Sequence, residues 1–205
     1  MGQFEEAAKE LKAEIKRRYG GKRLELHINS VAEFARKTAQ KIAPGTSLPG
    51  KAQLSALAHD LYKGWSQKEL RDFIVGESVP LDMETRRLGG GLLHGPAAAH
   101  YLRTRLGIRD NEIIDAVYYH TTSHPEAGLV EKILFCADYL EPNRPQRAEE
   151  ADVRSLGRKI TRTLDEVYRE ILCRKLVYTL GKGRPLHSNG VTAWNALNLD
   201  GKPKK

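Results

Sequence analysis

The sequence predicts an all-α protein that folds as one helical domain. Apolar residues recur every three or four positions along most of the chain, the spacing that gives a helix one buried face. No segment alternates apolar and polar residues convincingly enough to predict a strand, and no repeat of roughly 20 to 50 residues is present. The 205 residues are enough for about one domain with a core of its own.

The first half of the chain predicts four helices, each bounded by a recognisable start or stop signal. Gly20 ends the first helix and Pro44 closes the second. Gly64 follows the third helix in the position of a C-terminal glycine cap. Ser66 precedes Glu69 at capping-box spacing and opens the fourth. The expected ranges are 3–18, 23–43, 51–63 and 67–75.

The second half begins with an expected irregular loop over residues 76–93, because it contains Pro80 and three consecutive glycines. Asp110 is a suitable cap for the helix that follows it. The helix ended by Pro142 carries apolar residues on two flanks, which predicts burial on more than one side. A break is expected at Gly157. The predicted helices here are 95–106, 112–120, 129–140, 149–180 and 188–198.

These elements divide into three segments. Residues 1–20 form an N-terminal helix that docks either on the domain or on a second subunit, residues 21–198 form the domain, and residues 199–205 form a basic tail. We expect a homodimer, although no apolar stripe identifies its interface.

Composition narrows the class of protein and of partner. Hydrophobic residues make up 40% of the chain and charged residues 29%, which argues against disorder. The net charge of +8 favours anionic partners without choosing among them. Two cysteines, Cys136 and Cys173, are too few for a disulfide framework, and no apolar run is long enough to span a bilayer. A cytoplasmic protein with no membrane partner is expected.

The residues that predict chemistry are histidines and aspartates in or beside apolar helices. Asp60 directly follows His59 near the end of one such helix, and Asp138 lies inside the most apolar helix of the chain. Burying an unpaired carboxylate costs a free energy on the order of several kcal/mol. A divalent cation shared by the two acids would neutralise both charges. In sequence order, the histidines and acids of this pattern are His27, His59, Asp60, His94, His120 and Asp138.

The order of these residues resembles the H…HD…D signature of the HD-domain metal-dependent phosphohydrolases. Five further segments resemble the bacterial YqeK family, and they are AHDLYK (58–63), LLHGP (92–96), YYHTT (118–122), EKILFCADYLEPNR (131–144) and KGRPLH (182–187). The similarity covers about residues 20–198. It departs from the family pattern at Asn143 and Ser123, where the family often has glycine, and in the glycine run 89–91.

The resemblance implies a helical hydrolase that splits diadenosine tetraphosphate symmetrically into two ADP, with iron as the usual metal. By the same resemblance, His27, His59, Asp60 and Asp138 form a first metal site, His94 and His120 hold a second metal, and Asp60 bridges the two. A hydroxide formed on the metals would attack phosphorus, so that no protein nucleophile is needed. Imidazole and carboxylate ligands alone also suit Mn, Zn or Ni.

Other residues near these motifs are candidates for binding substrate. Lys63 follows Asp60 closely enough to contact phosphate and to stabilise charge in the transition state. Arg144 has the planar group for a bidentate phosphate contact, and the hydroxyls of Thr121 and Thr122 are suitable donors. We expect His124 to be a loop residue rather than a general acid. His187 is expected to be structural and His100 to be a packing or surface residue.

Three alternative functions remain open at this point. The first is hydrolysis of another nucleotide, a mono- or triphosphate, since members of a superfamily share phosphate chemistry while loops select the substrate. The second is nucleic-acid binding, which the net charge suggests but the dispersed basic residues and missing aromatic signatures make unlikely. The third is a nucleotide sensor without turnover, which the complete ligand set disfavours.

Overall fold

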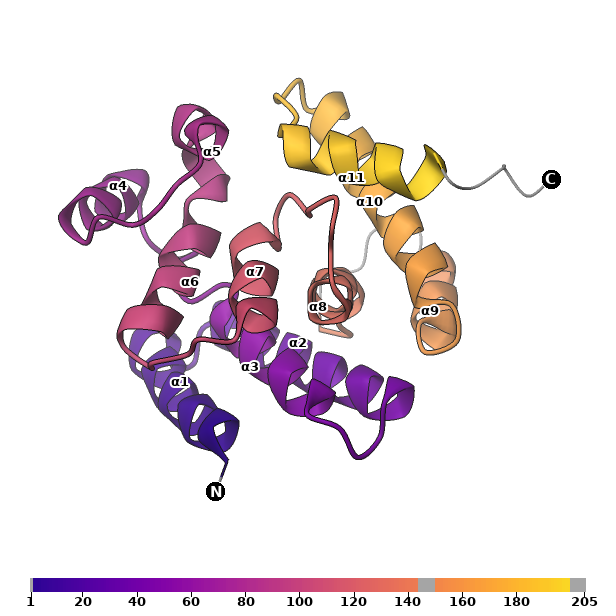
Figure 1. Ribbon diagram of the computed structural model, residues 1–205, viewed down its shortest axis with the longest axis horizontal. Helices are drawn as coiled ribbons and strands as arrows, with labels where there is room; N and C mark the ends of the chain where they lie inside the picture. The colour runs from indigo at the N-terminus through magenta and orange to yellow at the C-terminus, as the bar shows by residue number, and fades with distance from the viewer. Residues whose placement is uncertain (1, 144–149, 200–205) are drawn as a thin grey trace.

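The computed structural model describes residues 2–143 and 150–199, and within these ranges every regular element is a helix (Figure 1). The all-α prediction is therefore confirmed. The elements are α1 (Gln3–Tyr19), α2 (Arg23–Ile42), α3 (Leu48–Ala58), α4 (Gln67–Gly76), α5 (Met83–Leu88), the short 3₁₀ helix η1 (Gly90–Leu92), α6 (His94–Thr104), α7 (Asn111–Tyr119), α8 (Leu129–Leu140), α9 (Glu150–Lys159), α10 (Leu164–Gly181) and α11 (Ser188–Leu199).

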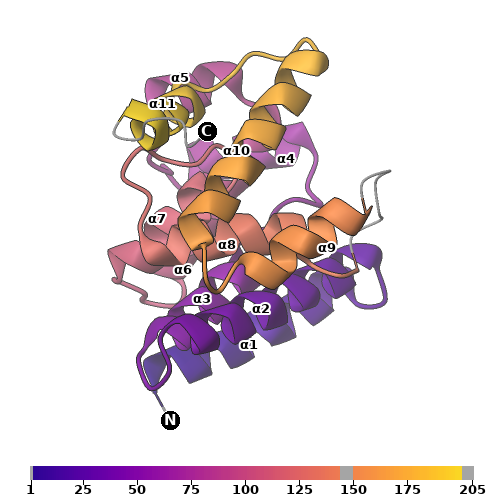
Figure 2. The ribbon, with the colours of Figure 1, turned by 90° about the vertical axis from the view of Figure 1, so that its right-hand side faces the viewer.

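Helix α8 is the centre of the packing. It contacts α2, α3 and α7 through one core and α10 through another (Figure 2). Leu134 and Ala137 belong to the larger core, whereas Phe135 and Cys136 belong to the smaller core formed with α10 and α11. The prediction that this helix is buried on more than one side is confirmed, and its acids Glu131 and Asp138 are buried.

Helix α1 docks on the domain of its own chain. Leu11, Ile15 and Tyr19 are buried in the larger core, and α1 packs against α3. The Tyr19 hydroxyl donates to the Leu61 carbonyl at 2.8 Å, and a Cβ on Gly64 would lie only 2.7 Å from the Tyr19 ring. A glycine at position 64 leaves room for the Tyr19 ring, and through this ring α1 packs against the turn that follows Asp60.

The third helix differs from its expected range at both ends. It begins at Leu48, with Pro49 in its first turn, and ends at Ala58, whereas residues 59–64 form turns. The His59 ring donates to the Ala56 carbonyl at 2.6 Å, and this carbonyl is the acceptor that a further helical turn would have used. The backbone amides of Leu61 and Lys63 instead donate to the carbonyls three residues earlier, those of Ala58 and Asp60.

Two other expectations were wrong. The segment 76–93 is not irregular throughout, because Asp82 caps α5 by accepting from the Thr85 amide at 2.7 Å. The break in the long C-terminal helix lies at 160–163 and not at Gly157. Ile160 is buried in the smaller core together with Val167, so the chain turns after α9 to bring both side chains inward.

The other sequence signals agree with the structure. Ser66 and Glu69 form the expected capping box of α4, and Asp110 caps α7 by accepting from the Glu112 amide at 3.0 Å. Residues 188–198 lie within α11. No described helix is long and apolar enough to cross a membrane.

Candidate metal centre

Six side chains from five helices or their ends converge between α2, α3, α6, α7 and α8. His27 lies on α2 and Asp138 on α8, while His94 begins α6 and His120 follows the last residue of α7. Asp60 and its neighbour His59 follow α3, and both are fully buried. The six are the residues proposed from the sequence, namely His27, His59, Asp60, His94, His120 and Asp138.

The first donor group surrounds one oxygen of Asp60. Asp60 Oδ2 lies 3.4 Å from His27 Nε2 and 3.3 Å from His59 Nε2. Asp138 Oδ1 lies 3.3 Å from His27 Nε2 and 3.9 Å from His59 Nε2. Two carboxylates and two imidazoles thus face one another.

The second donor group surrounds the other oxygen of the same carboxylate. Asp60 Oδ1 lies 3.1 Å from His94 Nε2 and 3.6 Å from His120 Nε2. The two Nε2 atoms are 2.9 Å apart. One aspartate therefore faces both groups, with one oxygen toward each.

The unsatisfied polar atoms of this cluster fit a bound cation. In each group the donor atoms of three residues lie within 4.8 Å of one another. Among the described residues, His27 Nε2, His59 Nε2 and Asp60 Oδ1 are buried without a hydrogen-bond partner. Buried polar atoms are rarely left in this state, and donors at about 2.0–2.2 Å from a metal necessarily lie within about 4.4 Å of each other. The residues present therefore fit a divalent metal.

Hydrogen bonds at the opposite ring nitrogen hold three of the histidines in the orientation a metal needs. His27 Nδ1 donates to Glu141 Oε1 at 3.0 Å, and His59 Nδ1 donates to the Ala56 carbonyl. His120 Nδ1 donates to the Val117 carbonyl at 2.7 Å. With the proton on Nδ1, the Nε2 lone pair faces the cluster, which is the usual arrangement behind metal-binding histidines.

The charges of the metal-free cluster compensate one another. Burial by itself would raise the pKa of Asp60, but the nearby imidazoles of His59, His120 and His27 hold that pKa well below its usual range. Burial lowers the pKa of His27, but the nearby carboxylates of Asp138 and Asp60 and the hydrogen bond to Glu141 outweigh it, so that the pKa is raised to about 10. Burial lowers the pKa of His120 to about 4. A metal would replace the proton on His27 as the partner of these carboxylates.

Two lysines contact the carboxylates from outside the cluster. Lys63 Nζ lies 2.6 Å from Asp60 Oδ2, and its side chain is 44% exposed. Lys175 Nζ, from α10, lies 3.4 Å from Asp138 Oδ2 and 3.9 Å from the centroid of the Phe135 ring. Lys63 is predicted from the sequence, whereas Lys175 is not, because no local motif connects α10 with this site.

Glu141 was also missed as a functional candidate. It is 3% exposed, and its Oε2 accepts from the Asn143 amide at 2.7 Å while Oε1 accepts from His27. A signal for it was present, since Glu141 follows Asp138 by three residues and therefore lies near the same face of α8.

The remaining candidates for binding substrate are Thr121, Thr122 and Arg144. The Thr122 hydroxyl donates to the Ser123 carbonyl at 3.1 Å, so it is already used as a donor in this conformation. Thr121 is half-buried beside it. Ser123 has a φ of 68°, the left-handed conformation that favours glycine, which explains why glycine suits this position. Arg144 lies outside the described residues.

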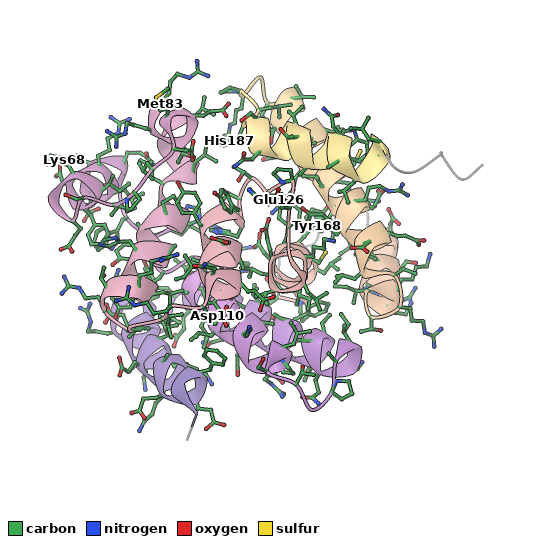
Figure 3. All side chains as sticks on the ribbon, in the orientation of Figure 1. Lys68, Met83, Asp110, Glu126, Tyr168 and His187 are labelled. Atoms are coloured by element: carbon green, nitrogen blue, oxygen red, sulfur yellow. The ribbon has the colours of Figure 1, made fainter. Side chains whose placement is uncertain are left out.

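Three histidines lie outside the donor groups. His124 stacks on Tyr119, with ring centroids 4.6 Å apart, and its Nδ1 accepts from the Glu126 amide. His187 is buried between α5 and α11, where its Nε2 lies 3.0 Å from Thr85 Oγ1 (Figure 3). His100 packs edge-on against Phe73.

The contact between α6 and α7 depends on a glycine next to a candidate ligand. A Cβ on Gly95 would lie 2.7 Å from the Tyr118 carbonyl oxygen and 3.3 Å from the His120 ring. Only glycine lets the two helices approach closely enough to bring His94 and His120 together.

Comparison with known proteins identifies a family and several relatives of this chain. The HD domain family matches residues 25–143. The chain is 32% identical to the symmetrical bis(5'-nucleosyl)-tetraphosphatase of Halalkalibacterium halodurans, over 74% of this chain and 78% of that protein. It is 27% identical to the protein of the same name from Bacillus subtilis, over 84% of this chain and 88% of that protein.

A solved structure is similar over nearly its whole length. An HD superfamily hydrolase from Clostridium acetobutylicum, described as involved in NAD metabolism, superposes with a TM-score of 0.78 at 26% identity, over 92% of this chain and 95% of that one. The family match spans α2 to α8, which are the helices that carry all six candidate ligands. The chain is a member of the HD-domain family.

Proposed function

We propose that the protein is a metal-dependent hydrolase that cleaves diadenosine tetraphosphate symmetrically into two ADP. Relatives similar over most of the chain are named for this reaction. In the reaction, one water adds across the bridging P–O–P bond between the second and third phosphates, and each half leaves as ADP. The observation that carries the proposal is a set of four imidazoles and two carboxylates, all buried except the half-buried His27, in a chain with these relatives.

The six side chains would hold one or two divalent metal ions. His27, His59, Asp60 and Asp138 would bind the first ion, and Asp60, His94 and His120 the second. Nitrogen and carboxylate donors suit iron, manganese, zinc or nickel, and we favour iron because of the family resemblance. A metal bound there polarises phosphate oxygens and lowers the pKa of a coordinated water.

The protein's own contribution is to orient ligands and to supply positive charge. Asp60 offers a separate oxygen to each donor group, and Glu141 fixes the orientation of the His27 ring. Lys63 is exposed enough to leave Asp60 and contact a phosphate once a metal neutralises that carboxylate. Lys175 supplies a second positive charge beside Asp138. Thr121 and Arg144 are further proposed contacts of the substrate.

No protein nucleophile is needed in this proposal. Cys136 is fully buried in the smaller core, and burial raises the pKa of its thiol, so it remains protonated. Ser123 is also fully buried, and its hydroxyl pairs with the Tyr168 hydroxyl (Figure 3 labels Tyr168). Water is therefore the proposed attacking group.

The test combines metal content with product identity. Protein purified without chelator should contain one to two equivalents of a transition metal and should release ADP as the sole product from diadenosine tetraphosphate. Asp60→Ala should lose both metal and turnover while keeping its helical circular dichroism.

Asp72→Ala is the matched control, because Asp72 is an exposed acid on α4 that pairs with Lys68. This variant should behave like wild type. Release of AMP and ATP would contradict symmetric cleavage, and full activity of Asp60→Ala would contradict the proposed centre.

A further inference from the structure

A second site is available on the far side of the helices that carry His94 and His120. A cavity of about 1140 Å³ lies among α4, α5, α6 and α7, and residues of the segment 78–82 form part of its wall. This volume slightly exceeds the roughly 300–1,000 Å³ of most small-molecule sites. Figure 1 shows α4 and α5 on the outer side of α6.

Helical geometry separates this cavity from the metal-ligand cluster. Arg103 lines the cavity and lies nine residues after His94 on α6; at about 100° per residue it is about half a turn from His94 around the helix. Tyr118 lines the cavity from α7, and the same geometry places it about 160° from His120. The α6–α7 pair therefore forms a wall of the cavity. None of the six candidate ligands lines it, although Leu93 and Tyr119, the sequence neighbours of His94 and His120, do.

The cavity concentrates positive charge. Arg71 from α4, Arg86 from α5, Arg103 from α6 and Arg109 from the segment before α7 all line it. Within the part of the chain that the structure describes, none of these four guanidinium groups forms an ion pair with an acid; Arg103 instead donates to the Asn111 side chain at 3.0 Å.

Two acids also line the cavity, and one is already engaged. Asp82 accepts hydrogen bonds from the Thr85 amide and hydroxyl and from the Tyr118 hydroxyl. Asp115 is the other acid, and it faces the positive charge of Arg103. Four arginines against two acids leave a net positive cavity, which suits a ligand with several negative charges.

The rest of the lining suits a flat apolar group. Buried Ile74, Val79, Leu93 and Ile114 contribute aliphatic surface, and the Tyr118 ring borders them. A ligand with several phosphates at one end and an aromatic ring at the other matches both halves of this lining.

We propose that this cavity is a second nucleotide site, which binds a nucleoside polyphosphate with its phosphates on the arginines and its base on the apolar wall. The site is separate from the metal centre and needs no metal. Because its wall is the α6–α7 pair, an occupant contacts the two helices that hold His94 and His120, and it is placed to regulate the centre. The proposal does not depend on which phosphate ester the metal centre cleaves.

Binding of ADP to the full-length chain tests the proposal. Isothermal titration calorimetry is done with wild-type protein in EDTA and with Asp60→Ala, so that metal-dependent binding is removed in two independent ways. Both should bind one ADP per chain. Changing Arg71 and Arg103 together to alanine should weaken this binding at least tenfold, whereas Arg105→Ala should not, because Arg105 lies outside the cavity lining and pairs with Glu77.

Two further probes separate the two halves of the site. Adenosine, which lacks phosphate, and inorganic pyrophosphate, which lacks a base, should each bind at least tenfold more weakly than ADP. Absence of ADP binding in EDTA, equal effects of the cavity and control variants, or equal binding of either partial probe would overturn the proposal.

Discussion

The carboxyl group of Glu131 makes the stability of this protein depend on pH in a way that one substitution should remove. Glu131 lies on α8, is 4% exposed, and its Oε1 has no hydrogen-bond partner among the described residues. Burial, and secondarily the charge of Asp115, raises its pKa from 4.5 to about 8. The folded protein therefore keeps a proton on Glu131 at neutral pH that the unfolded chain releases.

The sign and size of the effect follow from proton linkage. Because the folded pKa is raised, the contribution to stability is fully present below about pH 4.5 and is lost as the pH rises through about 8. Between these values the free energy of unfolding falls by about 1.4 kcal/mol per pH unit. Relative to its value at low pH, the free energy of unfolding is lower by about 3 kcal/mol at pH 7 and by less than about 1 kcal/mol at pH 5.

Glu131→Gln keeps the shape of the side chain and cannot ionise. The variant should therefore be more stable than wild type by about 3 kcal/mol at pH 7 and nearly equal to it at pH 5. Urea unfolding followed by circular dichroism at pH 5, 6, 7 and 8 measures this difference, with EDTA present so that metal binding adds nothing. A difference that stays constant with pH, or a wild type that is the more stable at pH 8, would refute the reasoning.

A matched control is available in the loop that precedes α8. Glu126→Gln removes one carboxyl from an exposed position on the loop before α8 (Figure 3), and its effect should be small at every pH.

Two more predictions concern the ligands themselves. Glu141→Gln should weaken metal binding about tenfold, since it removes the charge that orients His27; competition with a chelating dye measures this, and an unchanged affinity would exclude the positioning role. Gly95→Ala should lower the free energy of unfolding by about 1–3 kcal/mol and reduce metal content, because its Cβ meets the Tyr118 carbonyl. Gly91→Ala, with no atom near its added Cβ, should match wild type in both respects.

Much of the candidate site could be predicted because its residues conflict with their surroundings. Asp138 lies in an apolar helix and Asp60 closely follows one, and a buried acid needs a partner, so the two acids indicated a site before any geometry was known. The helices themselves follow from apolar spacing, and α8 needed two apolar flanks because it separates two cores.

The remainder depended on contacts distant in the sequence. Lys175 reaches Asp138 from α10, and nothing near Lys175 in the sequence indicates that contact. The break at 160–163 is set by burial of Ile160 in a core that exists only after α10 and α11 have packed. Helix α5 has only six residues, too few to show a period, and it is held by contacts with the last helix.

Several predictions stay untested by the structure. These are the homodimer, the cytoplasmic location, the division into segments 1–20, 21–198 and 199–205, the identity of the metal and the phosphate contact of Arg144. The metal analysis proposed above addresses the metal directly.

Hydrogen bonds between α5 and the start of α11 join segments that are far apart in the sequence. Thr85 pairs with His187, and Glu84 accepts from the Ser188 amide at 3.1 Å, across more than one hundred residues of sequence. Contacts this distant close late in folding, because the entropy of the intervening chain must be lost first. During synthesis, α5 therefore stays without this anchor until the C-terminal helix has emerged.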